Sequence, residues 1–196
     1  MKLDFPIINK YIDLSNPVSE QDIERFEKMM NVKLPLSFVS LKKEIADCLY
    51  INSGNALEIF SLFDSNSSTF SIAGISSNYA HLGDILKSHK LLIFGISSVD
   101  SETWAFYTGG KYSNGEYPVI WISPSEERFF VHSSNFESFL NIQFHSLTSL
   151  NEGADYDKLY KDLVAKYDND ILPFGYNDIY SSSHDLEDFE SIIKQY

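Results

Sequence analysis

The stretch VSEQDIERFEKMMNVKLPLSF (residues 18–38) decides how the chain begins to fold. Ser19 is a good helix N-cap, and Asp22 stands three residues later, where a capping box places its acidic partner. Asn31 tolerates the left-handed backbone that often ends a helix. The apolar residues between these two ends recur at helical spacing: Ile23, Phe26 and Met30. The sequence therefore predicts a short amphipathic helix between Ser19 and Asn31.

A second helix is predicted directly after the first. Leu34 precedes a proline, which biases its backbone towards extended geometry. Pro35 suits the first turn of a helix, where its missing N–H leaves no hydrogen bond unmade. An apolar stripe follows: Phe38, Leu41, Ile45 and Cys48. The opening thus predicts two helices joined by an extended Leu-Pro elbow, with the second helix reaching a buried, inert Cys48.

The chain of 196 residues has the length of one domain and a net charge of −13. This charge argues against binding nucleic acid or an anionic membrane through a broad surface, and it is compatible with a basic partner or with solubility alone. Residues 151–196 hold eleven acids against four lysines. A single cysteine excludes an internal disulfide. With no secretion signal or membrane-spanning run visible, we expect a cytoplasmic protein.

Apolar runs between turn-forming residues predict the remaining elements. The predicted strands lie near residues 57–63, 91–96, 103–107, 117–123 and 128–132, with a further short strand over 69–75. One predicted helix begins after the capping residues 133–135, and two more cover residues 156–167 and 184–196. Residues 78–88 also show helical spacing, although Gly83 weakens the helix prediction there. Alternation along 103–107 places Trp104 and Phe106 on one face of their strand.

The sequence contains no catalytic or metal-binding pattern. We find no Gly-x-Ser-x-Gly, no His-Glu-x-x-His and no Cys-x-x-Cys. The five histidines are scattered without a metal-ligand spacing: His81, His89, His132, His145 and His184. We therefore expect no catalytic residues, no bound metal and no cofactor.

Several blocks of the sequence, in the same order and spacing, resemble the SMI1/KNR4 family of the SUKH superfamily. The residues that carry the likeness are Ser19, Asp22, Ile23, Phe26 and Glu27, then Val32, Leu34, Pro35 and Phe38, then Leu91, Leu92, Phe94 and Gly95, then Trp104, Ala105, Phe106 and Tyr107, then Pro118, Val119, Ile120 and Trp121, and finally Asn135, Phe136, Glu137, Phe139 and Leu140. Two loops depart from the family pattern. The glycine-rich acidic loop is here residues 96–101 without glycine, and the asparagine-glycine after the second helix is here residues 52–54.

The resemblance implies an α+β fold, with a mixed, mainly antiparallel sheet flanked by helices. It implies one SMI1/KNR4-like domain over residues 18–144, preceded by an N-terminal arm over 1–17. We expect residues 145–196 to form an acidic helical C-terminal extension packed on the same domain.

The resemblance also implies a function. Many bacterial members of this family resemble immunity proteins, and an acidic inhibitor suits a basic, nuclease-type toxin. The leading hypothesis is a non-enzymatic immunity protein that binds and neutralises a cognate toxin, or another basic protein, but neither nucleic acid nor a membrane. One alternative is a regulatory or scaffold protein, and another is an enzyme with an unrecognised site in a cleft beside Trp104 and Trp121. The oligomeric state is left open.

Acidic residues on the loops beside the predicted sheet form the predicted partner-binding site. They are Asp100, Glu102, Glu116, Glu126 and Glu127. Trp104 and Tyr107 are predicted aromatic anchors if they are exposed; the alternative is that both belong to the core. If this surface does not bind the partner, the acidic segment 151–196 is the next candidate.

Overall fold

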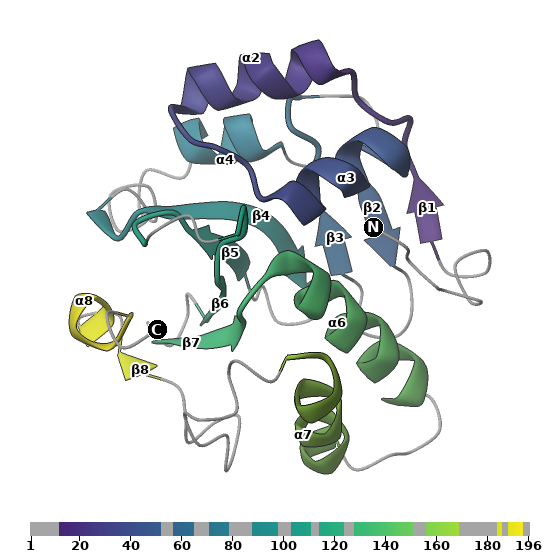
Figure 1. Cartoon of the computed structure of the whole chain (residues 1–196), viewed down its shortest axis with the longest axis vertical. Helices are drawn as coiled ribbons and strands as arrows, with labels where there is room; N and C mark the ends of the chain where they lie inside the picture. The colour runs from purple at the N-terminus through teal and green to yellow at the C-terminus, as the bar shows by residue number, and fades with distance from the viewer. Residues whose placement is uncertain are drawn as a thin grey trace.

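One antiparallel sheet organises the fold, with eight strands that follow one another in chain order (Figure 1). The computed structural model describes residues 12–51, 57–64, 71–78, 88–97, 103–110, 114–123, 128–150, 156–168, 184–185 and 188–193. The strands are β1 (Ile12–Leu14), β2 (Leu49–Ile51), β3 (Leu57–Ile59), β4 (Leu91–Ser97), β5 (Thr103–Tyr107), β6 (Val119–Ser123), β7 (Arg128–Ser133) and β8 (His184–Asp185). All ladders between them are antiparallel. A parallel bridge between Ser61 and Ser71 stands outside the named strands.

The helices occupy three of the connections and the end of the described chain. They are α2 (Glu20–Met30), α3 (Leu36–Glu44), α4 (Ile72–Asn78), α6 (Phe136–Leu150), α7 (Tyr156–Tyr167) and α8 (Phe189–Ile193). Helices α2 and α3 separate β1 from β2, α4 separates β3 from β4, and α6 and α7 separate β7 from β8. The expected α+β class, a sheet flanked by helices with a helical C-terminal part, is confirmed.

The caps predicted for the first helix are present. Ser19 is the N-cap of α2, and its hydroxyl accepts a 3.1 Å hydrogen bond from the Asp22 amide. That hydroxyl in turn donates to the Asp22 carboxylate at 2.7 Å. Asn31 ends the helix with φ 52° and ψ 44°, in the left-handed region. Local rules therefore determine both ends of α2.

Glu27 holds the elbow between α2 and α3. Its carboxylate accepts a 2.9 Å hydrogen bond from the Leu34 amide and contacts the Lys33 ammonium at 2.6 Å. The extended segment has no helical partner for that amide, so the glutamate satisfies it. Pro35 was predicted in the first turn of the second helix. It is instead the N-cap of α3, one position before that turn begins.

The second helix is shorter than predicted. It ends at Glu44, and Cys48 lies beyond it, buried next to the start of β2. The ammonium of Lys42 donates to the backbone carbonyl of Asp47, which turns the chain back across the end of the helix. Ile45 and Cys48 have the spacing of a helix stripe because both side chains face the core, although neither belongs to α3.

Two further predictions were wrong. Residues 69–75 were predicted as a strand, but α4 begins at Ile72 because the Ser71 hydroxyl accepts a 2.8 Å hydrogen bond from the Gly74 amide, as a capping residue does. Residues 184–196 were predicted as one helix, but His184 and Asp185 pair with the edge of β7, and in the described part of this range the α-helix covers Phe189–Ile193.

The other predicted elements match closely. Strands β4 to β7 follow the predicted ranges to within two residues, β3 is shorter than its predicted range, and α7 has the predicted bounds. Asn135 caps α6, accepting a 2.8 Å hydrogen bond from the Ser138 amide, and the helix continues to Leu150 across the predicted 144/145 boundary. Residues 1–11 of the predicted arm and most of 78–88 lie outside the described part.

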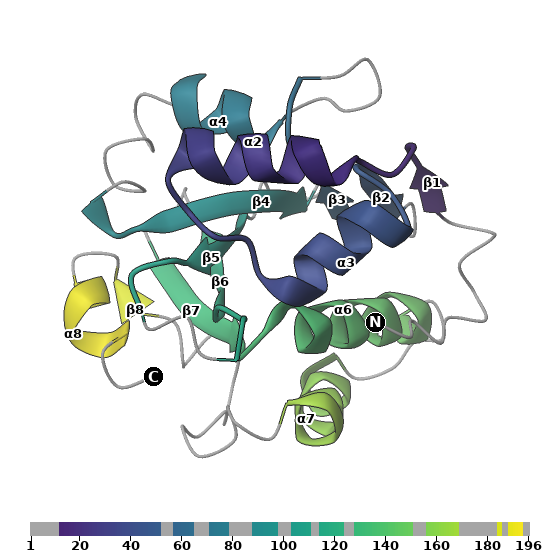
Figure 2. The same ribbon diagram turned by 45° about the horizontal axis from the view of Figure 1, so that its top comes forward.

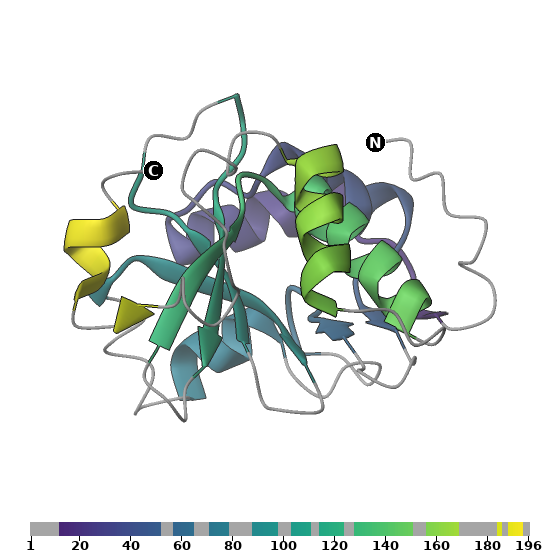
Figure 3. The same ribbon diagram turned by 90° about the horizontal axis from the view of Figure 1, so that it is seen from below.

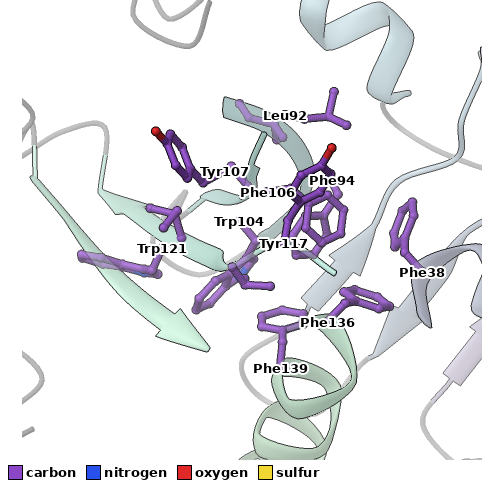
Figure 4. Packing of buried hydrophobic residues seen from close by; sticks show 14 of the residues in the cluster. Phe38, Leu92, Phe94, Trp104, Phe106, Tyr107, Tyr117, Trp121, Phe136 and Phe139 are labelled. Carbon is purple, nitrogen blue, oxygen red and sulfur yellow. The ribbon is translucent and has the colours of Figure 1, made fainter. Parts of the chain in front are cut away.

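The inner face of the sheet, defined as the face that carries Trp104, Phe106 and His132, packs against α3, α6 and α7 (Figure 2). Phenylalanine rings from two strands and two helices meet there (Figure 4). Phe94 stacks on Phe106 at 4.2 Å, and Phe38 of α3 lies 4.9 Å from Phe136 of α6. Edge-to-face and offset contacts of this kind add to the gain from burying large apolar surfaces.

The outer face, defined as the face that carries Tyr107 and Phe129, contacts α8. That helix lies on the opposite side of β7 from α6 and α7 (Figure 1 and Figure 3). Its fully buried Phe189 lies 4.6 Å from the Phe129 ring and 5.5 Å from the Tyr107 ring. The two faces of the sheet are thus packed by elements of very different length.

Candidate partner-binding site

Four acidic residues of the predicted site belong to two connections of the sheet. Asp100 and Glu102 follow β4 and precede β5, and Glu126 and Glu127 follow β6 and precede β7. All four lie outside the described residues. Their covalent neighbours at the strand ends are described, and these show from where the two connections leave the sheet.

The strand ends that flank the two connections are neighbours. Ile96 pairs with Thr103, Thr103 pairs with Ile122, and Ser123 pairs with Arg128. In a meander, every second connection returns at the same end of the sheet, so the β4–β5 and β6–β7 connections leave side by side. Neither connection contains a lysine or an arginine. We call this end of the sheet, with its connections 98–102 and 124–127, the acidic end.

The C-terminal part of the chain adds to the same end. Asp185 of β8 pairs with Arg128 in the register. Three residues later, Asp188 is exposed at the start of α8. In sequence, residues 185–190 (Asp-Leu-Glu-Asp-Phe-Glu) contain four acidic residues and no basic one.

Glu116 lies at the opposite end of the sheet and has a structural role. Its carboxylate accepts hydrogen bonds from the Ser37 amide at 2.8 Å and from the Ser37 hydroxyl at 2.7 Å. The N-cap residue of α3, Pro35, offers no side-chain cap, so Glu116 satisfies a helix-end amide from 79 residues away. The preceding Gly115 has φ 78° and its carbonyl accepts from the Leu36 amide at 2.8 Å.

The two predicted aromatic anchors are buried and lie on opposite faces. Trp104 is 4% exposed and contacts Phe139 and His132 on the inner face. Tyr107 is 9% exposed and contacts Phe189 on the outer face. The two side chains were predicted to anchor a partner only if they were exposed, and neither is exposed. The predicted pairing of Trp104 with Phe106 on one face is confirmed by their contacts with α6.

A lysine is enclosed in the core near the end of α3. Lys42 has no exposed surface, and its ammonium donates to the carbonyls of Asp47 and Phe60 and lies 4.8 Å from the centre of the Phe38 ring. Burial lowers its pKa to about 8, although the Asp47 carboxylate 3.8 Å away acts in the opposite direction. Burial also raises the pKa of Asp47. The pair ties α3 to the segment after β3.

A histidine is enclosed on the inner face. The His132 ring lies 3.0 Å from the Gln143 amide nitrogen and 3.3 Å from the Ser133 hydroxyl. Burial lowers its pKa to about 3, so the imidazole is neutral at pH 7. The Tyr160 hydroxyl of α7 donates to the backbone carbonyl of His132 at 3.3 Å. Sequence inspection placed no function on these groups, and in the structure they join β7 to α6 and α7.

The described part of the chain contains no group of three or more histidine, cysteine, aspartate or glutamate side chains placed to hold a metal ion. Trp104 and Trp121, beside which an enzyme site was considered, are 4% and 7% exposed. Within the same part, no helix has the length and apolar character that crossing a bilayer requires.

Comparison with known proteins identifies the family. The family model for the SMI1 / KNR4 family (SUKH-1) matches residues 17–142, which covers α2 to the middle of α6. No match was found among curated proteins, and none was found among solved structures. Because the family model spans well over half of the chain and includes the helix pair and strands β2 to β7, this protein belongs to the SMI1/KNR4 (SUKH-1) family.

Proposed function

We propose that this protein is a non-enzymatic protein-binding domain that acts in the cytoplasm as a bacterial immunity protein, which binds and neutralises a cognate nuclease-type toxin. Membership of the SUKH-1 family is consistent with an immunity-type protein. The net charge of −13 supports a basic partner, because opposite charge raises the association rate and favours the correct orientation.

The observation that carries the proposal is the strand register at the acidic end. It places the strand ends that flank 98–102 and 124–127 next to one another, which supports one binding surface rather than two separate ones. A nuclease needs a basic groove to bind its substrate, and an acidic surface that enters the groove excludes that substrate. Glu116 is not part of this proposed surface, because it caps α3 at the other end.

The test uses the toxin encoded beside the gene, co-expressed with wild-type protein and with the double variant Asp100→Lys/Glu102→Lys. We expect the variant to lose rescue and to associate about 10-fold to 1000-fold more slowly. The association rate of the wild type should also fall steeply with added salt. The matched control is Glu24→Lys/Glu44→Lys, which reverses two exposed charges on α2 and α3 and should leave rescue unchanged.

Unchanged rescue and an unchanged association rate in the Asp100/Glu102 variant would show that the acidic end is not the binding surface. Deleting the acidic segment 151–196 would then test whether that segment is the binding surface. If no toxin is encoded beside the gene, the immunity role loses its main support and the scaffold alternative takes its place.

A further inference from the structure

The turn before β6 places an exposed asparagine directly before a glycine. Asn114 and Gly115 are the only Asn-Gly pair in the sequence. Both residues have positive φ, 52° and 78°, as the two central residues of a type I′ turn do. Asn114 is exposed, and within the described part of the chain no hydrogen bond involves the Gly115 amide. The side chain and the peptide nitrogen that follows it are therefore both accessible to reaction.

These two groups can react with each other. The peptide nitrogen of Gly115 attacks Cγ of Asn114, and the new C–N bond closes a five-membered succinimide ring. The bond from Cγ to the side-chain nitrogen breaks, and ammonia leaves with the proton of the Gly115 nitrogen. Water then opens the ring at either carbonyl, which gives aspartate or isoaspartate. No electrons are transferred, and water is the only co-reactant.

The residue after the asparagine decides how easily the ring closes. Gly115 has no side chain to crowd the attacking nitrogen, and its backbone adopts conformations that other residues avoid. The exposed turn can also open locally without global unfolding. Asn141 of α6 is the opposite case, because β-branched Ile142 follows it and the helix uses the Ile142 amide for its own hydrogen bonds.

The same turn holds the start of α3. The Gly115 carbonyl accepts a 2.8 Å hydrogen bond from the Leu36 amide, and the Glu116 carboxylate accepts one from the Ser37 amide at 2.8 Å. These amides belong to the first turn of α3, where a helix offers them no acceptor of its own. A Cβ atom on Gly115 would lie 2.4 Å from Cδ1 of Leu36, so the turn packs directly against the helix.

We propose that Asn114 is a site of spontaneous deamidation, and that its isoaspartate product releases the start of α3 from this turn. Isoaspartate lengthens the backbone at residue 114 by one methylene group, which shifts Gly115 and Glu116 relative to the helix. Aspartate keeps the backbone length and adds a negative charge, so both hydrogen bonds to α3 stay in place. The two products of one reaction therefore differ in their effect on the fold.

Peptide mass spectrometry on the full chain tests the reaction. The protein is incubated at mildly alkaline pH, and the mass increase on exchange of an amide for a carboxyl group is followed at each asparagine. We expect Asn114 to be converted about 10-fold or more faster than Asn141. The control Asn114→Gly keeps a turn that accepts positive φ and should show no mass increase in the same peptide. A rate at Asn114 no greater than that at Asn141 would overturn the proposal.

Hydrogen exchange tests the effect on α3. Chromatography separates the isoaspartate form from unchanged protein, and freshly prepared Asn114→Asp supplies the aspartate form. We expect the amides of Leu36 and Ser37 to exchange about 10-fold faster in the isoaspartate form than in the wild type, because their acceptors have moved. Asn114→Asp should exchange at the wild-type rate, and the amides of β4 should stay equally protected in all forms.

Two results of this second measurement would also overturn the proposal. If Leu36 and Ser37 exchange equally in the isoaspartate and unchanged forms, the modification does not reach α3. If the amides of β4 lose protection in parallel, the modification loosens the whole domain rather than the start of one helix. Both measurements are made without the toxin, so they leave the proposed function to its own test.

Discussion

The two faces of the sheet are packed with equally buried aromatic rings but held by very different means. On the inner face, Phe136 comes from a helix of 15 residues, and rings of α3, β4 and β5 surround it. On the outer face, Phe189 comes from a helix of five residues attached at the edge of the sheet. Full burial is therefore not a measure of how much of the fold depends on a side chain; the element that carries the side chain decides this.

The largest effect is expected from a matched pair of truncations. Phe136→Ala should lower the free energy of unfolding by about 4 kcal/mol, because the cavity cannot collapse among rings held by three other elements. Phe189→Ala should lower it by less than about 2 kcal/mol, because the loss is limited to the free energy of docking α8. Urea unfolding followed by far-UV circular dichroism measures both. Equal losses would show that the fold depends on the outer face as much as on the inner face.

The next effect concerns the enclosed lysine. Lys42→Met should lower the free energy of unfolding by about 3 kcal/mol, because it removes the ammonium that donates to the Asp47 and Phe60 carbonyls and leaves the Asp47 carboxylate without this cation. Adding Asp47→Asn should recover part of the loss, since the amide oxygen still accepts from the Leu62 amide. The control Lys43→Met changes a partly exposed lysine and should cost under about 0.5 kcal/mol.

The inner face should also respond to pH through His132. The unfolded chain binds a proton at this residue below about pH 6.5, whereas the folded protein does so only near pH 3, so acid favours unfolding across that interval. Between pH 7 and pH 5, His132 should account for about 2 kcal/mol of lost stability. Urea unfolding at the two pH values should show a shallower dependence for His132→Gln. An equally steep dependence in that variant would assign the effect to other groups.

The smallest effect is expected at the cap of α3. Glu116→Ala should cost about 1 kcal/mol, in line with other helix caps, and Glu116→Gln should cost less because it keeps an acceptor for the Ser37 amide. Thermal unfolding of both variants beside Glu137→Ala, an exposed control, measures this. Neither Glu116 variant should alter toxin rescue, since the cap lies at the other end of the sheet from the acidic end.

The sequence predicted best where neighbours along the chain make the decisive contacts. The caps at Ser19 and Asn31, and the apolar runs of β4 to β7, each depend on residues a few positions apart. It failed at residues 69–75, where a single Ser71 cap outweighs strand-like composition, and at His184, where an open sheet edge outweighs helical spacing. The family likeness, carried by short motifs in a definite order, was confirmed over residues 17–142.

The sequence by itself determined the α+β class, the family, the acidic charge and the absence of a recognisable catalytic motif. Only the tertiary structure separated the predicted site into its parts: Glu116 became a cap for α3, Trp104 and Tyr107 went to opposite faces, and the strand ends that flank the two acidic connections became neighbours. The physical reason is that strand register and helix docking bring together residues far apart in sequence. Their burial and hydrogen bonds are properties of the assembled sheet, so no local pattern records them.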